Sequence, residues 1–300
     1  MAAFELVLPN LARLPQRGDL RARWALANEL GLDVVELPAD LVKNRREERI
    51  TGIPIGGFLG PEAVDVLYSP GPPEARYVLH TDPGIPRRDG TMFIPELRWG
   101  EKGWTSGYAD SLGLTARRLG PAPLMIEVHS GRHCDLEQVI EAAAGLAKAM
   151  RSRCGKEVMV GVENKVGQIM ATGEDMARAG DLMDLSGEDA LGIVLDVPNL
   201  WKSRGRRAPE DLDVVPIRRL LGVHVHDRHR PPDPGGQIDW EAVADLLERT
   251  DGALINPEVF HRRDLVATLE FIRERLLPGR LPSRKAWNGV GENPHKDGAV

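Results

Sequence analysis

Hydrophobic and polar positions along the chain follow two alternating periods. Short runs of β-branched and aliphatic residues, most of which stop at a turn-forming residue, predict eight strands. These runs lie at 4–10, 32–38, 76–82, 123–131, 157–167, 191–199, 220–227 and 253–259. In most gaps between them, apolar residues recur every three or four positions, which is the pattern of one buried helix face.

The helical pattern predicts helices at 19–30, 106–119, 135–151, 172–185, 240–248 and 263–276. The third of these is the clearest, because Leu136, Val139, Ile140 and later apolar residues form one stripe. Asp135 and Gln138 stand where an N-terminal cap pair is expected. Alternating strands and helices, with strands apolar on both faces, are typical of a parallel sheet covered by helices.

Eight such units predict the α/β class and a single (β/α)8 TIM barrel with parallel strands over residues 1–278. Residues 279–300 are rich in Gly and Pro and are predicted to form a C-terminal tail. An open, doubly wound sheet is the alternative, but no GxGxxG motif follows the first strand to support a dinucleotide site. Two runs compete for the assignment of the third strand, VDVLYS at 64–69 and RYVLHTD at 76–82.

Composition limits the classes of function. The 300 residues carry a formal net charge of −6, with 28% charged and 42% hydrophobic residues, which describes a globule with a sizeable core. This balance disfavours a generally basic nucleic-acid binder, although it leaves room for a local basic patch. No apolar stretch reaches membrane-spanning length and the N-terminus lacks a signal-peptide pattern, so a cytoplasmic protein without membrane contact is expected. Cys134 and Cys154 are too few for a disulfide framework.

Polar residues end four consecutive predicted strands. Side chains along a barrel strand alternate between the interior and the helix layer. The valines at 158, 160 and 162 share one parity, so Glu163 takes the other and points inward at the carboxyl end of its strand. The same alternation turns Asp196, His224 and Glu258 inward, at successive separations of 33, 28 and 34 residues. Each separation is about one βα unit, which predicts a ring of these four residues at the barrel mouth.

Three carboxylates in one ring repel each other at neutral pH unless a cation or shared protons offset their charge. Carboxylate oxygens with one imidazole suit Mn²⁺, Mg²⁺, Co²⁺ or Zn²⁺, and the residues do not choose among them. Any one of these residues alone is more often an ordinary strand-end polar group. Four in succession on one parity favour a site for one divalent metal ion.

Short motifs at the strand ends carry a family resemblance. They are VGVENKVGQ, GIVLDVPN, HVHDRHR, GGQIDW and INPEVF, all in the second half of the chain. Through them the chain resembles the xylose isomerase-like TIM barrels, which include sugar isomerases, ketose 3-epimerases, inosose dehydratases and the endonuclease IV type of DNA-repair enzyme. The resemblance covers roughly residues 1–277, and its specific motifs lie from residue 124 onward.

The resemblance implies that Glu163, Asp196, His224 and Glu258 are the metal ligands. His224 is preferred to His226 because an acid, Asp227, follows it by three residues. The residues implied in substrate binding are His80, His129, Asn199, His226, Asp227 and Arg230. The sequence departs from the family at Asn199, where the family has a histidine that binds substrate or a second metal. Asn199 can hydrogen-bond a sugar hydroxyl but is a poor zinc ligand.

The function implied is that of a divalent-metal-dependent isomerase or epimerase. It would abstract a proton next to a carbonyl on a small polyol or sugar, free or phosphorylated, with Glu163 and Glu258 as the catalytic acid and base. The alternatives are an endonuclease IV-like phosphodiesterase acting on DNA and a catalytically silent binding module. ENKVGQ and the DRH triplet favour the nuclease, whereas Asn199 and the position of DRH directly after His224 weigh against it. A homo-oligomer is left open.

Two further segments bear on the site. Residues 81–104 follow the third strand, on the face where barrel active sites are built, so they are a candidate lid. Its Arg87, Arg88, Arg98, Trp99 and Trp104 would cover a ligand; the alternative is a solvated loop with its tryptophans packed on itself. Glu36, at the end of the second strand, is expected to lie at the surface or behind the ligands.

Overall fold

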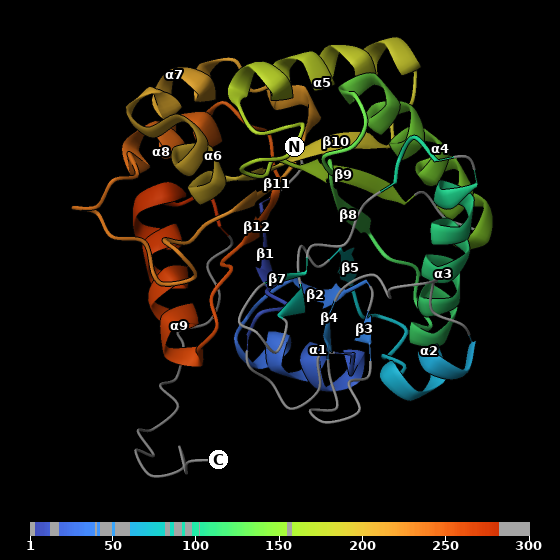
Figure 1. The fold of residues 1–300 in the computed structure, drawn as a ribbon. Helices are drawn as coiled ribbons and strands as arrows, with labels where there is room; N and C mark the ends of the chain where they lie inside the picture. The colour runs from blue at the N-terminus through green and yellow to red at the C-terminus, as the bar shows by residue number, and fades with distance from the viewer. Residues whose placement is uncertain are drawn as a thin grey trace.

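Eight parallel strands close into a barrel in the order β1-β12-β11-β10-β9-β8-β5-β2. The structure is a computed structural model that describes residues 4–12, 18–39, 41–42, 50–51, 61–81, 85–86, 92–93, 98–101, 103–154 and 158–281. Helices lie between successive barrel strands and surround the barrel (Figure 1). The predicted (β/α)8 TIM barrel is therefore confirmed.

Each barrel strand lies inside one of the eight predicted runs. The strands are β1 (Glu5–Leu8), β2 (Val34–Pro38), β5 (Tyr77–His80), β8 (Met125–His129), β9 (Met159–Glu163), β10 (Leu191–Asp196), β11 (Leu220–His224) and β12 (Leu254–Asn256). RYVLHTD supplies the third of them, because most of the competing run falls in helix α2 (Pro61–Leu67). Two small antiparallel sheets were not predicted: β3 (Leu41–Val42) pairs with β4 (Ile50–Thr51), and β6 (Ile85–Pro86) with β7 (Met92–Phe93).

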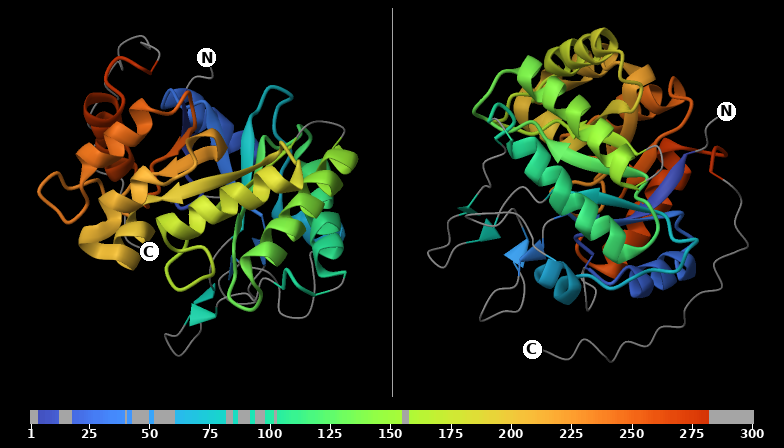
Figure 2. Two further views of the ribbon diagram at one scale, coloured as in Figure 1. Left: turned by 90° about the horizontal axis from the view of Figure 1, so that it is seen from above. Right: turned by 90° about the vertical axis from the view of Figure 1, so that its right-hand side faces the viewer.

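The helix layer wraps around the outside of the barrel strands (Figure 2). It contains α1 (Leu20–Glu29), α3 (Trp104–Leu119), α4 (Leu136–Cys154), α5 (Gly173–Ser186), α8 (Trp240–Glu248) and α9 (Arg262–Phe271), which continues as a π-helical turn, Ile272–Leu276. Polar side chains cap α1, α5 and α8 at their N-termini, and Asp135 and Gln138 exchange side-chain to backbone hydrogen bonds ahead of α4, as predicted. Helices α6 (Val197–Arg204) and α7 (Ala208–Asp213) follow β10 and were not predicted.

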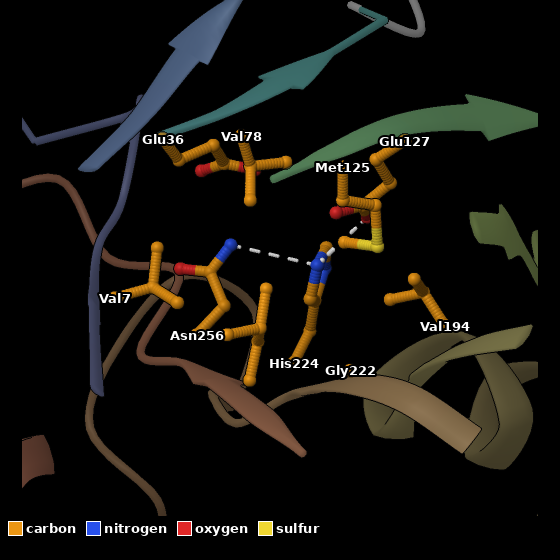
Figure 3. A pocket seen from close by; sticks show the side chains of 10 residues that line it. Val7, Glu36, Val78, Met125, Glu127, Val194, Gly222, His224 and Asn256 are labelled. Atoms are coloured by element: carbon orange, nitrogen blue, oxygen red, sulfur yellow. Dashed lines mark hydrogen bonds and ion pairs between the residues drawn. The ribbon is translucent and has the colours of Figure 1, made fainter. Parts of the chain in front are cut away.

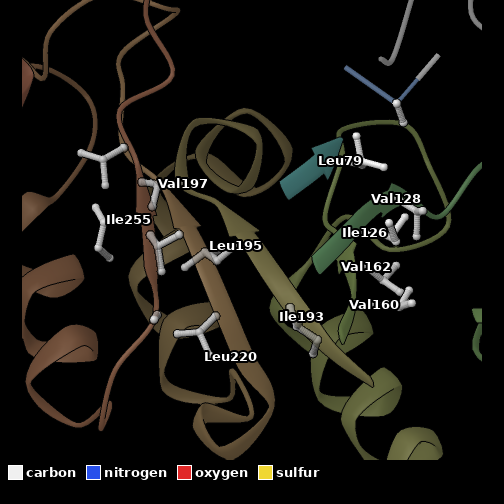
Figure 4. Packing of buried hydrophobic residues seen from close by; sticks show 14 of the residues in the cluster. Leu79, Ile126, Val128, Val160, Val162, Ile193, Leu195, Val197, Leu220 and Ile255 are labelled. Carbon is white, nitrogen blue, oxygen red and sulfur yellow. The ribbon is translucent and has the colours of Figure 1, made fainter. Parts of the chain in front are cut away.

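The core has two compartments separated by the strands. Outward-facing residues such as Val160, Val162 and Ile193 pack between the strands and the helices (Figure 4). Inside the barrel a smaller cluster contains Val7, Val34, Val78, Met125 and Val194. The valines of β9 thus face the helices, and the opposite parity faces the barrel interior, as the alternation predicts.

Some sequence predictions fall on residues outside the described ranges. These are most of the candidate lid at 81–104, including Arg87 and Arg88, and the tail from 282 onward. Within the described part of the chain, no helix has the length and apolar character needed to cross a membrane.

Candidate metal centre

Four strands deliver the predicted ligands to one end of the barrel. Glu163, Asp196 and His224 are the last residues of β9, β10 and β11, and Glu258 follows β12 by two residues. All four are buried. The potential ligand atoms of Asp196, His224 and Glu258 lie within 4.8 Å of one another, and so do those of Glu163 and His224 with a further acid, Glu127.

The Nδ1 atom of His224 lies at the centre of this arrangement. It is 3.9 Å from Oε1 of Glu163 and 3.9 Å from Oε2 of Glu258. This nitrogen is buried and has no hydrogen-bond partner among the described residues. A buried polar atom without a partner is costly, and two carboxylates beside an imidazole nitrogen form a donor set that suits a divalent cation. The residues present therefore fit a metal ion.

Asp196 is held from two sides. Its backbone is fixed by the side chain of Asn164, which accepts from the Asp196 N–H at 2.7 Å and donates to the Asp196 carbonyl at 3.2 Å. Its carboxylate caps α6, accepting from the Asn199 backbone N–H at 2.8 Å and from Asn199 Nδ2 at 2.5 Å. Asn199 therefore donates its amide to a proposed ligand, where the family histidine would bind substrate or a second ion.

A second potential ligand group shares Glu163. Oε2 of Glu163 lies 2.6 Å from His129 Nε2 and 3.2 Å from His80 Nε2, and the two imidazole rings stack with centroids 5.3 Å apart. The ligand atoms of His80, His129 and Glu163 lie within 4.8 Å of one another. Glu163 thus turns one oxygen toward each group.

Two buried carboxylates behind these groups complete the cluster. Glu36 Oε1 lies 2.5 Å from His80 Nδ1, and its Oε2 accepts the backbone N–H of Asn10 at 2.7 Å. Glu127 Oε1 lies 2.9 Å from His224 Nε2 and 3.6 Å from His80 Nε2. Glu127 was missed in the sequence because only strand ends were considered. The signal was available, since Glu127 shares its parity with His129 two residues later.

The cluster is strongly coupled electrically. Burial alone would lower the pKa of His80, but the carboxylates of Glu127 and Glu36 outweigh it and raise that pKa well above its usual range. Burial would raise the pKa of Glu163, but His129, Lys165 and hydrogen bonds from the histidines hold it well below its usual range. Burial likewise would lower the pKa of His224, but Glu127 outweighs it and raises that pKa well above its usual range. A proton and a metal ion therefore compete for the same buried nitrogens.

The segment after β11 adds two more histidines. His226 Nε2 lies 3.3 Å from Glu258 Oε2 and 3.7 Å from Asp196 Oδ2. The ring of His229 stacks on it at 4.6 Å between centroids, and the His229 backbone N–H donates to His226 Nδ1 at 3.0 Å. Arg228 and His229 both adopt the left-handed conformation, with φ of 50° and 59°. Non-glycine residues rarely adopt this conformation, so the turn is held by these contacts.

The predicted substrate residues divide between the cluster and this turn. His80, His129, Asn199 and His226 all contact proposed ligands. Asp227 and Arg230 pair through their backbones, and Arg230 is exposed. Within the described ranges, no ion pair joins Arg230 to the carboxylates of the cluster.

Trp99, from the candidate lid, is packed against the protein. It is 4% exposed, its Nε1 donates to the His129 carbonyl at 3.1 Å, and its ring meets Trp104 edge-on at 5.1 Å. For this residue the structure agrees with the alternative of packing rather than with a mobile cover. Its hydrogen bond helps to fix the backbone that carries His129.

Comparison with known proteins places the fold in a family. A family model described as xylose isomerase-like TIM barrel matches residues 111–275, more than half of the chain. The chain belongs to this family. Solved structures similar to this xylose isomerase-like barrel include D-psicose 3-epimerase from Clostridium cellulolyticum H10 with D-tagatose, at 13% identity and a TM-score of 0.56, covering 91% of this chain and 99% of that chain.

Two further similar structures represent both branches considered in the sequence. A D-tagatose 3-epimerase-like protein is 17% identical, with a TM-score of 0.56 over 91% of this chain and 97% of that chain. An AP endonuclease of family 2 from Brucella melitensis is 14% identical, with a TM-score of 0.55 over 91% of this chain and 99% of that chain. No curated protein matches this xylose isomerase-like barrel. At these identities the likeness to solved structures establishes the fold alone.

Proposed function

We propose that this protein is a divalent-metal-dependent isomerase or epimerase acting on a small sugar or polyol, free or phosphorylated. The observation that carries the proposal is the placement of Glu163 and Glu258. Each presents a carboxylate oxygen 3.9 Å from the same nitrogen, Nδ1 of His224, one from β9 and the other from beyond β12. Two carboxylates that face one point from different strands are suited to proton transfer on two sides of a bound substrate.

Glu163, Asp196, His224 and Glu258 would hold the ion. When bound, Mn²⁺, Mg²⁺, Co²⁺ or Zn²⁺ would polarise a substrate carbonyl and lower the cost of removing a neighbouring C–H proton. The described part of the chain that surrounds these residues is buried and rich in imidazole. The similarity to structures named as sugar 3-epimerases supports a sugar as the substrate class.

The protein's own groups would move the proton. Glu163 would take it from one face of the substrate, with His129 Nε2 at 2.6 Å and His80 Nε2 at 3.2 Å to receive or supply a proton in turn. Glu258 would return a proton on the other side, with His226 Nε2 3.3 Å away. Asn199, Asp227 and Arg230 are proposed to contact substrate hydroxyls or a phosphate.

The test combines substrate turnover with isotope exchange. The protein, supplied with each of the four ions, is incubated with a panel of ketoses, aldoses and their phosphates in D₂O, and NMR follows both the products and deuterium entry at carbon. Glu163→Gln and Glu258→Gln are expected to lower turnover by about 10²–10⁴-fold, because each loses a proton-transfer group. Glu29→Gln, on the surface beside Arg262, is the matched control and should keep wild-type turnover. Full turnover in both site variants would contradict the scheme.

A second candidate, a metal-dependent phosphodiesterase acting on DNA, is favoured by one observation. His80, His129 and Glu163 form a ligand group of their own beside the first. Five buried carboxylates belong to the two groups or contact them: Glu36, Glu127, Glu163, Asp196 and Glu258. When ionised they carry −5, which one divalent ion reduces to −3 and two reduce to −1. Two or more bound ions per chain with cleavage of an abasic-site duplex would favour the phosphodiesterase; one ion with sugar conversion would favour the isomerase. If the protein shows neither activity, the binding module is favoured.

A further inference from the structure

A layer of side chains lies inside the barrel beneath the proposed ligands. Figure 3 shows this region, where the apolar side chains of Val7, Val78, Met125 and Val194 surround a small polar group. The polar group consists of Glu36, Glu127, His224 and Asn256. Glu127 comes from the middle of β8, is 2% exposed, and approaches His224 from the side opposite Glu163 and Glu258: it lies at Nε2, whereas they lie at Nδ1.

We propose that Glu127 is a positioning residue that holds the His224 ring with Nδ1 directed at the metal ion. The inference rests on the proposed metal centre for the identity of the ion, and on contacts in the protein for the role of Glu127. Imidazole ligands of metals generally donate their second ring N–H to a carboxylate or carbonyl, which fixes both the ring orientation and the position of the proton.

The orientation of the His224 ring follows from the distances. Glu127 Oε1 lies 2.9 Å from His224 Nε2 and forms an ion pair with the ring when the ring is protonated. With a proton on Nε2 this contact is attractive, as it is where a metal-ligating imidazole turns its second ring N–H to a carboxylate. Asn256 Nδ2 is farther from the same nitrogen, at 3.4 Å. This contact leaves the Nδ1 edge of the ring facing Glu163 and Glu258, where Nδ1 has no hydrogen-bond partner among the described residues.

The presence of an acid at this depth also needs an explanation. Met125, two residues before Glu127 on β8, belongs to the apolar cluster inside the barrel, and its register partner on β9, Met159, packs against that cluster. Burying a carboxylate there costs several kcal/mol unless partners offset it. His224 and His80 are the ion-pair partners of Glu127 in the described chain, and His224 is the nearer by 0.7 Å. A carboxylate without a partner at this position would make the folded protein less stable than an apolar side chain would.

The experiment measures ion binding by Glu127→Ala, Glu127→Gln and the matched control Glu36→Gln. Dissociation constants for Co²⁺ and Zn²⁺ are obtained by competition with a coloured chelator, and melting curves check that each variant folds. Glu127→Ala is expected to weaken binding by about 10–100-fold. Glu127→Gln should lose less, because its amide oxygen still accepts the imidazole N–H. Glu36→Gln removes an equally buried carboxylate, but one that contacts His80, and it should lose less than Glu127→Ala.

A second measurement separates positioning from loss of charge. Crystal structures of the metal-free wild type and Glu127→Ala should show the His224 ring rotated in the variant only, and Glu127→Gln should restore the wild-type orientation. Unchanged affinity in Glu127→Ala, an equal loss in Glu36→Gln, or an unrotated ring would each overturn the assignment. If the wild type binds no divalent ion, the metal centre itself is wrong, and the ring orientation in the metal-free crystals still decides the role of Glu127.

Discussion

Replacing Asn164 with alanine should destabilise the protein and weaken the proposed metal centre together. Asn164 is fully buried, and its side-chain amide makes two hydrogen bonds to the backbone of Asp196. Each such bond contributes about 1 kcal/mol net, and a buried backbone group left without a partner costs about 1–3 kcal/mol. The expected loss in the free energy of unfolding is therefore about 2–4 kcal/mol, a large share of the roughly 5–15 kcal/mol typical of a folded protein.

Urea titrations followed by circular dichroism measure this loss, and chelator competition measures the affinity for Co²⁺. The affinity should fall because Asp196 is no longer fixed at the end of β10. Thr268→Val is the control: it removes one side-chain hydrogen bond, to the Asp264 carbonyl at 2.7 Å, within α9, a helix that carries none of the proposed ligands. It should cost about 1 kcal/mol and leave ion binding unchanged. A loss below about 1 kcal/mol for Asn164→Ala, with unchanged ion affinity, would refute the reasoning.

Two glycine substitutions should change the free energy of unfolding in opposite directions in the same urea assay. In β10, the new methyl group of Gly192→Ala would overlap Leu221 and lower the free energy of unfolding by about 1–3 kcal/mol. In α4, Gly145 is exposed with open space around it, so Gly145→Ala should raise it by about 0.5–1 kcal/mol. The free energy of unfolding should fall as pH rises above about 10. Burial raises the pKa of Tyr77, whose hydroxyl donates to the Pro121 carbonyl at 2.8 Å. The Tyr77 hydroxyl therefore loses its proton at a lower pH in the unfolded state than in the folded state. Tyr77→Phe should show a smaller fall; an equal fall would assign it to other groups. Chelation with EDTA should lower the melting temperature, since an ion at about 100 times its Kd stabilises by about 2.7 kcal/mol, and added Mn²⁺ or Zn²⁺ should restore it; an unchanged melting temperature would count against a metal centre.

Much of the architecture could be predicted because burial imposes a period on the sequence. The valines at 158, 160 and 162 face the helices, so the alternation along β9 turns Glu163 to the barrel interior. Sequence spacing could not supply the layer beneath, because Glu127 is not at a strand end and its role depends on a contact between β8 and β11. The small sheets and helices α6 and α7 were missed because two-residue strands and six- to eight-residue helices leave weak periodic signals.

The atomic details of the centre also depend on neighbours that are distant in the sequence. No pattern in HVHDRHR indicates that His229 lies flat on His226, because that placement follows from two successive left-handed residues in the turn. The dual use of Glu163, with one oxygen toward each ligand group, likewise emerges only when β5, β8 and β11 are brought together.

The closure of the barrel between its first and last strands has a consequence for biosynthesis. β1 pairs with β12 through Glu5 with Leu254 and Leu6 with Ile255, and Glu258 follows directly after this seam. A nascent chain on the ribosome completes β8 to β11 well before β12 emerges, and until then β1 and β11 present unpaired edges. Glu258 therefore joins its partners only in the last step of assembly, so a truncated translation product would lack full affinity for the proposed ion. Loading with the ion would thus mark a chain that has been made to its final strand.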